Sequence, residues 1–147
     1  MREPPNYKQG KQSEVENQNA PNRIPLVGRV AAGLPILAQE NVDRYVTIPE
    51  HLMSQNHQYY ALRVNGDSMI DAGIFNFDIV IVKKTNTAKL NDIVVALIND
   101  EATVKRLKQS DSTYYLKAEN EYYEDIFPTT EWSIQGVVVG LIRDQIS

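Results

Sequence analysis

The fold of this chain is decided by the stretch Tyr59-Tyr60-Ala61-Leu62-Arg63-Val64-Asn65-Gly66-Asp67-Ser68-Met69. Its first six residues are mostly apolar or aromatic, a composition typical of a buried β-strand. The pair Asn65-Gly66 then favours a tight bend. We therefore expect a strand that ends at a bend, with one serine, Ser68, presented there.

A second strand-like run, Ala102-Thr103-Val104-Lys105-Arg106-Leu107, contains a lysine that bears on the role of this serine. Because side chains alternate along a strand, Lys105 shares a face with Thr103 and Leu107. One interpretation is an exposed lysine on an edge strand. The other is a lysine that apolar neighbours hold uncharged, so that it accepts the proton of Ser68 Oγ. In the second case burial lowers the pKa of Lys105, and the reaction accelerates as the pH rises above neutral.

Other roles for the serine fit the sequence less well. A serine after Gly-Asp is commonly only a turn residue. The nucleophile elbow of α/β-hydrolases requires Gly-x-Ser-x-Gly, and position 70 is isoleucine here. A histidine base could only be His51 or His57, and neither lies in a setting that suggests a triad. If Ser68 is activated, Lys105 is the candidate base.

The bend also offers candidates for an oxyanion hole. The backbone N–H groups of Asp67 and Ser68 are free to point into a cleft, where they stabilise a tetrahedral intermediate. We expect the carboxylate of Asp67 to cap the turn rather than to act as a catalytic acid.

The segment from Ile24 to Leu37 is apolar but is interrupted by two prolines and two glycines, which predicts an extended, turn-rich conformation. It is either an edge strand with a turn or a recognition strand that lies in a cleft. The bond between Ala32 and Gly33 suits a narrow cleft, because alanine is small and glycine has no Cβ. A substrate tethered in the same chain also has a high effective concentration. We therefore regard Val30-Ala31-Ala32-Gly33 as the substrate candidate for Ser68.

Composition places the chain among ordinary soluble proteins. Its 147 residues suit a single domain, and the formal net charge of −4 argues against a nucleic-acid-binding surface. The absence of cysteine excludes disulfides and thiolate metal sites, and the two histidines match no zinc spacing, so we expect no metal and no cofactor. The N-terminus has no apolar signal segment, and the longest apolar run, Gly136 to Ile142, is too short to span a bilayer. These features predict a cytoplasmic protein without membrane attachment.

Frequent turns separate many short runs of β-forming residues, which predicts a mostly-β fold, a compact domain of several short antiparallel strands. The expected strands are 42–48, 58–64, 78–83, 93–98, 102–107, 113–118 and 132–142, the last bulged at a glycine. Asn99-Asp100 is expected to form a hairpin turn, residues 49–53 a helical turn and residues 70–77 a tight loop or short helix. Residues 1–23 are almost wholly polar and are expected to form a flexible tail.

Three segments together resemble the C-terminal domain of LexA-type repressors and their relatives, the self-cleaving Ser-Lys peptidases of the LexA and UmuD-like kind. They are Pro25-Leu26-Val27-Gly28-Arg29-Val30-Ala31-Ala32-Gly33, Gly66-Asp67-Ser68-Met69 and Thr103-Val104-Lys105-Arg106-Leu107. Their order and spacing also agree with that family, over residues 25 to 143. The resemblance implies a β-rich, signal-peptidase-like catalytic domain in which Ser68 is the nucleophile and Lys105 the base. It also implies that the Ala32-Gly33 bond is cut within the same molecule.

The resemblance further implies a homodimer formed partly through the C-terminal strand, and a RecA filament on single-stranded DNA that stabilises the docked conformation. The output would be induction of the SOS response to DNA damage. The implied organisation is a tail at 1–23, a cleavage-site segment at 24–42 and a peptidase and dimerisation domain at 43–147. Because only a polar tail precedes Ile24, we expect no DNA-binding domain and no operator binding by this chain alone.

Three alternatives differ in function. A UmuD-like accessory subunit of a translesion polymerase also has a short arm, but such arms resemble a Cys-Gly bond and this chain has no cysteine. A non-catalytic domain that only dimerises or docks a partner does not require Ser68, Lys105 and the Ala32-Gly33 bond together. A signal-peptidase-like enzyme uses the same pair of side chains but needs a membrane anchor.

Overall fold

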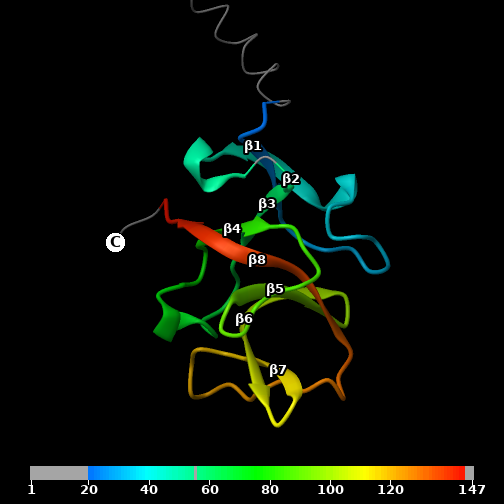
Figure 1. Cartoon of the computed structure of the whole chain (residues 1–147). Coiled ribbons are helices and arrows are strands. Elements are labelled where there is room, and N and C mark those ends of the chain that lie inside the picture. The colour runs from blue at the N-terminus through cyan, green and yellow to red at the C-terminus, as the bar shows by residue number, and fades with distance from the viewer. Residues whose placement is uncertain (1–19, 55, 145–147) are drawn as a thin grey trace, which may run out of the picture.

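The computed structural model describes residues 20–54 and 56–144, and Figure 1 shows that strands dominate this part of the chain. The strands are β1 (Arg23–Val27), β2 (Val42–Thr47), β3 (Tyr59–Arg63), β4 (Ile79–Lys83), β5 (Ile93–Ile98), β6 (Glu101–Ser110), β7 (Thr113–Lys117) and β8 (Trp132–Ile142). The described helices are short 3₁₀ turns, η1 (Gln39–Asn41), η2 (Glu50–Leu52) and η3 (Ile70–Ala72), and none is long and apolar enough to cross a membrane. The prediction of a mostly-β fold is confirmed. Most of the expected tail, residues 1–19, lies outside the described residues.

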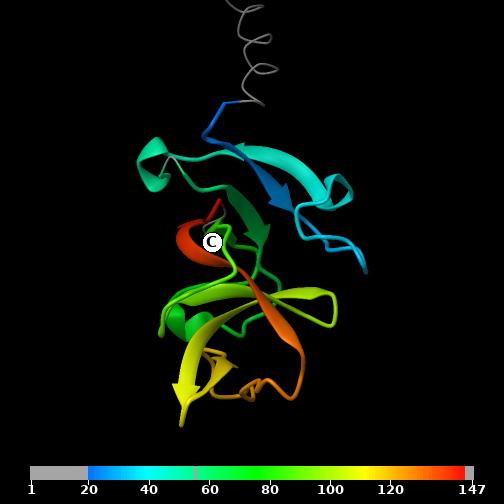
Figure 2. The ribbon, with the colours of Figure 1, turned by 45° about the vertical axis from the view of Figure 1, so that its right-hand side comes forward.

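All eight strands belong to one sheet, in the order β2-β1-β3-β4-β8-β5-β6-β7. The long strand β8 lies between the group β1–β4 and the group β5–β7 (Figures 1 and 2). Neighbouring strands are antiparallel with one exception, because β1 and β3 run parallel through the pairs Leu26–Ala61 and Val27–Leu62. Since β1 has a partner on both sides, the interpretation of its segment as an edge strand is wrong, and the edges are β2 and β7.

The β5–β6 hairpin sets the register of the strand that carries the candidate lysine. Asn99 and Asp100 both have positive φ, 52° and 64°, as a two-residue type I′ turn requires. Asparagine and aspartate adopt this left-handed conformation more readily than other non-glycine residues, which explains the turn at this dipeptide. The hairpin pairs Ile98 with Glu101 and continues until Lys105 lies opposite Val94. The predicted hairpin is thereby confirmed.

Two bulges bend β8, and each lies beside a glycine, whereas the sequence predicts a single bulge at a glycine. The pairing with β4 skips Val139 next to Gly140, and the pairing with β5 skips Gln135 next to Gly136. A Cβ on Gly136 would lie 2.4 Å from Val82 Cγ1 and would also meet the backbone of β4, so no other residue fits there without displacement. The bulges curve the sheet around the core that supports the bend at residue 68.

The main core cluster lies beneath that bend. It joins Tyr60 and Leu62 of β3 to Val104 of β6 and to Met69, which is 1% exposed. Each such side chain contributes roughly 1.5–3 kcal/mol when buried. Because Met69 directly follows Ser68, burial of the methionine anchors the serine at the surface of this core.

Candidate active site

Ser68 and Lys105 lie within hydrogen-bonding distance of each other. Lys105 Nζ lies 3.2 Å from Ser68 Oγ, 2.6 Å from Thr103 Oγ1 and 3.2 Å from the carbonyl oxygen of Val104. An ammonium group donates to all three oxygens. A neutral amine donates to two of them and accepts a hydrogen bond from one hydroxyl, which Ser68 can supply and a carbonyl cannot. The arrangement therefore accommodates both protonation states with only a rotation of the serine hydroxyl.

Lys105 is buried in the interior of the sheet. It is 6% exposed, and its strand β6 lies between β5 and β7 rather than at an edge. Within the described part of the chain, no carboxylate forms an ion pair with this amine. Burial consequently lowers the pKa of Lys105 below its ordinary value. The interpretation as an exposed lysine on an edge strand is wrong, and the expected common face of Lys105 and Thr103 is confirmed by their hydrogen bond.

The bend that presents Ser68 is held from both sides. Gly66 has φ of +95°, a conformation that favours glycine, and its N–H donates a 2.7 Å hydrogen bond to Asn76 Oδ1. On the other side, η3 ends at Gly73, which has φ of +80° and donates its N–H to Ile70 O. These contacts explain why strand β3 ends, why the chain then turns sharply, and why residues 65–67 are exposed.

The backbone N–H groups expected to form an oxyanion hole belong to this bend. Neither Asp67 N nor Ser68 N donates a hydrogen bond to any acceptor among residues 20–54 and 56–144. The Asp67 carboxylate accepts a 2.5 Å hydrogen bond from the hydroxyl of Tyr123 instead of capping the turn. This bond raises the pKa of Tyr123 above its ordinary value. The carboxylate is thus already engaged by a side chain from a distant loop.

That loop, between β7 and β8, supplies residues that were not predicted from the sequence. Asn120 Nδ2 donates to Asp67 O at 2.9 Å, and Glu119 O accepts from Asp71 N at 2.9 Å. The Glu119 carboxylate accepts from Arg106 Nε at 2.9 Å. Residues 119–123 have neither helical nor strand periodicity. The residues to which they are hydrogen-bonded lie far away in sequence, so no local pattern identifies these residues as part of the site.

The candidate cleavage bond lies in an exposed turn. Leu34 N donates to Ala31 O at 3.2 Å, and Ala32 and Gly33 are exposed between them. Gly33 has φ of +81°, the left-handed conformation that such a turn requires at its third position. The chain between β1 and β2 projects from the sheet as a long loop (Figure 2). No hydrogen bond joins Ala32 or Gly33 to Ser68 or Lys105 in the described part of the molecule, so the structure brings the pair together without the bond.

The segment before the bond lies beside a cavity that reaches toward the bend. This cavity, of about 390 Å³, is lined by residues of three separate parts of the chain. Val30 belongs to the cleavage segment, Asn65 precedes the bend, and Ala102 lies on β6 three residues before Lys105. The cavity thus lies between the cleavage segment and the strands that lead to Ser68 and Lys105, although neither Ser68 nor Lys105 lines it.

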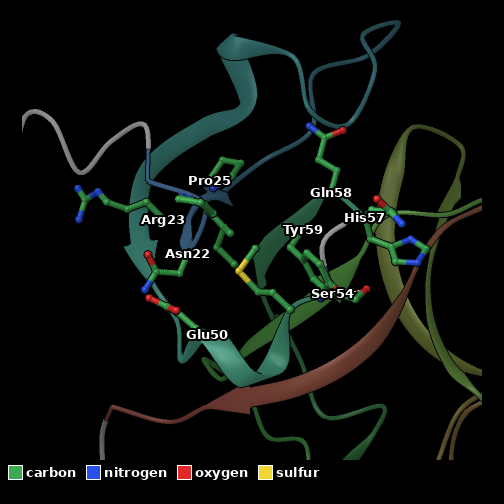
Figure 3. Close-up of a pocket in the computed structure, with 12 residues that line it drawn as sticks. Asn22, Arg23, Pro25, Glu50, Ser54, His57, Gln58 and Tyr59 are labelled. Atoms are coloured by element: carbon green, nitrogen blue, oxygen red, sulfur yellow. Dashed lines mark hydrogen bonds between the residues drawn. The ribbon is translucent and has the colours of Figure 1, made fainter.

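Figure 3 shows a second cavity, of about 880 Å³, and neither Ser68 nor Lys105 is among the residues that line it. It is lined by residues of β1, including Arg23 and Pro25, by His57 in the segment before β3, and by Tyr59, the first residue of β3. The other histidine, His51, lies in η2. Neither histidine donates to or accepts from Ser68 in residues 20–54 and 56–144, in agreement with a base of another type.

With this geometry in view, the comparisons with known proteins identify the class. The family described as Peptidase S24-like matches residues 25–139, and the chain belongs to this family. Among curated relatives, the chain is similar to LexA repressors. It is 51% identical over 122 residues to that of Alcanivorax borkumensis, 52% over 121 to that of Caldicellulosiruptor saccharolyticus and 45% over 120 to that of Leptospira interrogans. Each alignment covers 82% of this chain and 59% of the relative. The chain thus spans about three fifths of these relatives, and the expected likeness to a LexA-type C-terminal domain is confirmed.

Proposed function

We propose that this chain is a self-cleaving serine peptidase domain of a LexA-like repressor, with Ser68 as nucleophile and Lys105 as general base. The observation that carries the proposal is the 3.2 Å separation of Ser68 Oγ from an amine that is 6% exposed. A buried amine without an ion-pair partner in the described residues loses its proton more easily than a solvated lysine. Membership of a peptidase family agrees with this role.

The reaction begins when the Ala32-Gly33 bond docks against the bend. Lys105 Nζ takes the proton of Ser68 Oγ, and the oxygen bonds to the carbonyl carbon of Ala32. The carbonyl oxygen becomes an oxyanion that accepts hydrogen bonds from the N–H groups of Asp67 and Ser68. When the C–N bond breaks, the amine of Gly33 receives the proton from Lys105. Water, deprotonated by the same lysine, then attacks the ester carbonyl of Ala32. The ester bond breaks, Lys105 returns the proton to Ser68 Oγ, and Ala32 leaves as a carboxylate.

Docking is a separate conformational step in this account. The exposed turn at Ala32-Gly33 must move, and the cavity between Val30 and Asn65 provides the direction of approach. Because the substrate is tethered, weak docking suffices for reaction. An external protein such as a RecA filament on single-stranded DNA then acts by stabilising the docked conformation, without adding a catalytic group.

The partners and organisation follow the LexA relatives. In this proposal the chain forms a homodimer, the loss of repression induces the SOS response, and the protein acts in the cytoplasm. Residues 1–23 form a linker, 24–42 carry the cleavage site, and 43–147 form the peptidase and dimerisation domain. The names of the relatives favour a repressor over a polymerase accessory subunit. The buried Lys105 beside Ser68 argues against a domain that only docks a partner.

Incubation of the purified chain at alkaline pH tests the proposal. We expect a new fragment whose N-terminal residue is Gly33, formed with a first-order rate constant that does not depend on protein concentration. Ser68→Ala and Lys105→Ala should abolish it. Matched controls are Ser110→Ala and Lys108→Ala, because both residues lie on β6 outside the site. A chain that stays intact for days at alkaline pH contradicts the proposal.

A further inference from the structure

The side chain of Asn120 is fixed against the bend that carries Ser68. Its Nδ2 donates to Asp67 O at 2.9 Å, and its Oδ1 accepts from Tyr122 N at 3.0 Å. The residue is 8% exposed. A buried carboxamide with both ends engaged has one favourable orientation, so its bond to the bend is a constant feature of the site.

The carbonyl that Asn120 binds belongs to the same peptide group as the N–H of Ser68. No cis peptide bond occurs within residues 20–54 and 56–144, and in a trans peptide the C=O and N–H point in opposite directions. Holding the Asp67 carbonyl toward Asn120 therefore directs the Ser68 N–H to the opposite side. Ile70 N reaches the same carbonyl at 3.4 Å, so Asn120 makes the shorter of the two bonds.

We propose that Asn120 is a positioning residue for self-cleavage, which orients the Asp67–Ser68 peptide so that the Ser68 N–H faces the oxyanion formed on Ala32. This inference rests on the proposed function, because it takes Ser68 as the nucleophile. Asn120 acts through the backbone of the bend and not on the cleaved bond itself. This role explains why the loop between β7 and β8 contains a buried polar side chain, that of Asn120.

The residue before it strengthens the same arrangement. Glu119 O accepts from Asp71 N after the bend, and the Glu119 carboxylate accepts from Arg106 Nε. Arg106 directly follows Lys105 on β6. The dipeptide 119–120 thus connects the strand that carries the amine to the bend that carries the hydroxyl.

Two substitutions remove the bond from Asn120. Asn120→Asp keeps the size and the acceptor for Tyr122 N, but places an oxygen against Asp67 O. Asn120→Ala removes the carboxamide and serves if the acidic variant does not fold. Asn22→Ala is the matched control, because Asn22 Nδ2, just before β1, donates a comparable 3.2 Å bond to Ile48 O, just after β2. Thermal unfolding of each variant in a Ser68→Ala background establishes that it is folded.

Two rates are then compared at a temperature where all variants are folded: self-cleavage at alkaline pH, and labelling of Ser68 by a small organophosphonate. The probe also develops negative charge on an oxygen at the serine, but it needs no docking of the loop. Loss of an oxyanion donor lowers a rate about 10²–10³-fold. Misorientation of the Ser68 N–H should therefore lower the rates of self-cleavage and of labelling about tenfold or more. The pH midpoint of Asn120→Ala should not change, because this variant adds no charge and Lys105 keeps its contacts. Asn22→Ala should leave both rates unchanged.

Four results overturn the inference or the function on which it rests. Folded Asn120 variants that cleave and label at the wild-type rates refute the positioning role. Slower cleavage with unchanged labelling also refutes it, because Asn120 would then act on docking of the loop. A wild-type chain that is labelled but never cleaved refutes self-cleavage alone, and the labelling rates still decide the role of Asn120. A wild-type chain that is neither cleaved nor labelled refutes both.

Discussion

Thr103 Oγ1 lies 2.6 Å from Lys105 Nζ, closer to the amine than Ser68 Oγ at 3.2 Å. The two residues are neighbours on one face of β6, so the threonine holds the amine whatever the position of the bend. As an acceptor it favours the charged form of the amine, while burial opposes it. The hydroxyl of Thr103 and the burial of the amine therefore act in opposite directions on the proton affinity of Lys105.

Replacing that threonine should separate the two effects. Thr103→Val keeps the shape of the side chain and removes its hydroxyl, so the pKa of Lys105 should fall further. The pH midpoint of self-cleavage should move to lower pH. The maximal rate should fall about three- to tenfold, because the amine loses the contact that orients it. A rate profile between pH 6 and 11 measures both quantities, and a midpoint that moves upward contradicts this account.

Lys105 should also make stability depend on pH. Burial lowers the pKa of Lys105 below its ordinary value of 10.5, so between the lowered pKa and 10.5 the unfolded chain binds more protons than the folded chain. Unfolding free energy should therefore rise with pH across that window. The comparison is Ser68→Ala against Ser68→Ala with Lys105→Met, which removes the titrating group without self-cleavage. A stability difference between these two variants that does not change with pH contradicts the lowered pKa.

The ion pair of Arg143 with Asp78 predicts a second pH dependence of the same sign, in the acidic range. Asp78 is 1% exposed and accepts from Arg143 Nε at 2.8 Å and from Arg143 NH2 at 2.7 Å. These hydrogen bonds hold the pKa of Asp78 below its ordinary value of 3.8. Their stabilisation is present above pH 3.8 and is lost as the pH falls through the lowered pKa.

Arg143→Ala should lower the Tm by several degrees at neutral pH, since it leaves a buried carboxylate without its main partner. The difference from wild type should disappear in acid. Arg44→Ala, on the edge strand β2, is the control and should change the Tm little. Equal Tm values for Arg143→Ala and wild type at neutral pH would show that the pair is not a stabilising contact.

Asn41 should control access to the cleavage turn. Its Oδ1 accepts from Ala31 N at 2.9 Å, and its Nδ2 donates to Pro35 O at 2.9 Å and to Ile36 O at 3.2 Å. Asn41→Ala leaves these groups unpaired, at a cost of about 1–3 kcal/mol. In a Ser68→Ala background, limited digestion by an added protease should then cut residues 31–36 at least fivefold faster. Unchanged digestion would mean that Asn41 does not hold the loop.

Much of the architecture follows from local patterns. Runs of β-branched residues predicted β4 and β5, and the dipeptide Asn99-Asp100 predicted the hairpin that leads into β6. These features are local because neighbouring residues supply both the backbone preference and the turn. The order and spacing of the three motifs also pointed to the family that the comparisons identify. The catalytic roles of Ser68 and Lys105 stay predictions until cleavage is measured.

Other features depend on residues far apart in the chain. The parallel contact of β1 with β3, the engagement of the Asp67 carboxylate by Tyr123 and the support of the bend by Asn120 each join distant segments. Asn120 and Asp67 are 53 positions apart, and no local preference couples them.

The order of residues determined which segments become strands, where the chain turns and which side chains can do acid–base chemistry, because those properties depend on neighbours along the backbone. The folded arrangement decided that the amine of Lys105 is buried beside Ser68 and that the Ala32-Gly33 turn is exposed. Burial and distance arise only when separate strands pack against one another, and they set the proton affinity on which the proposed chemistry depends.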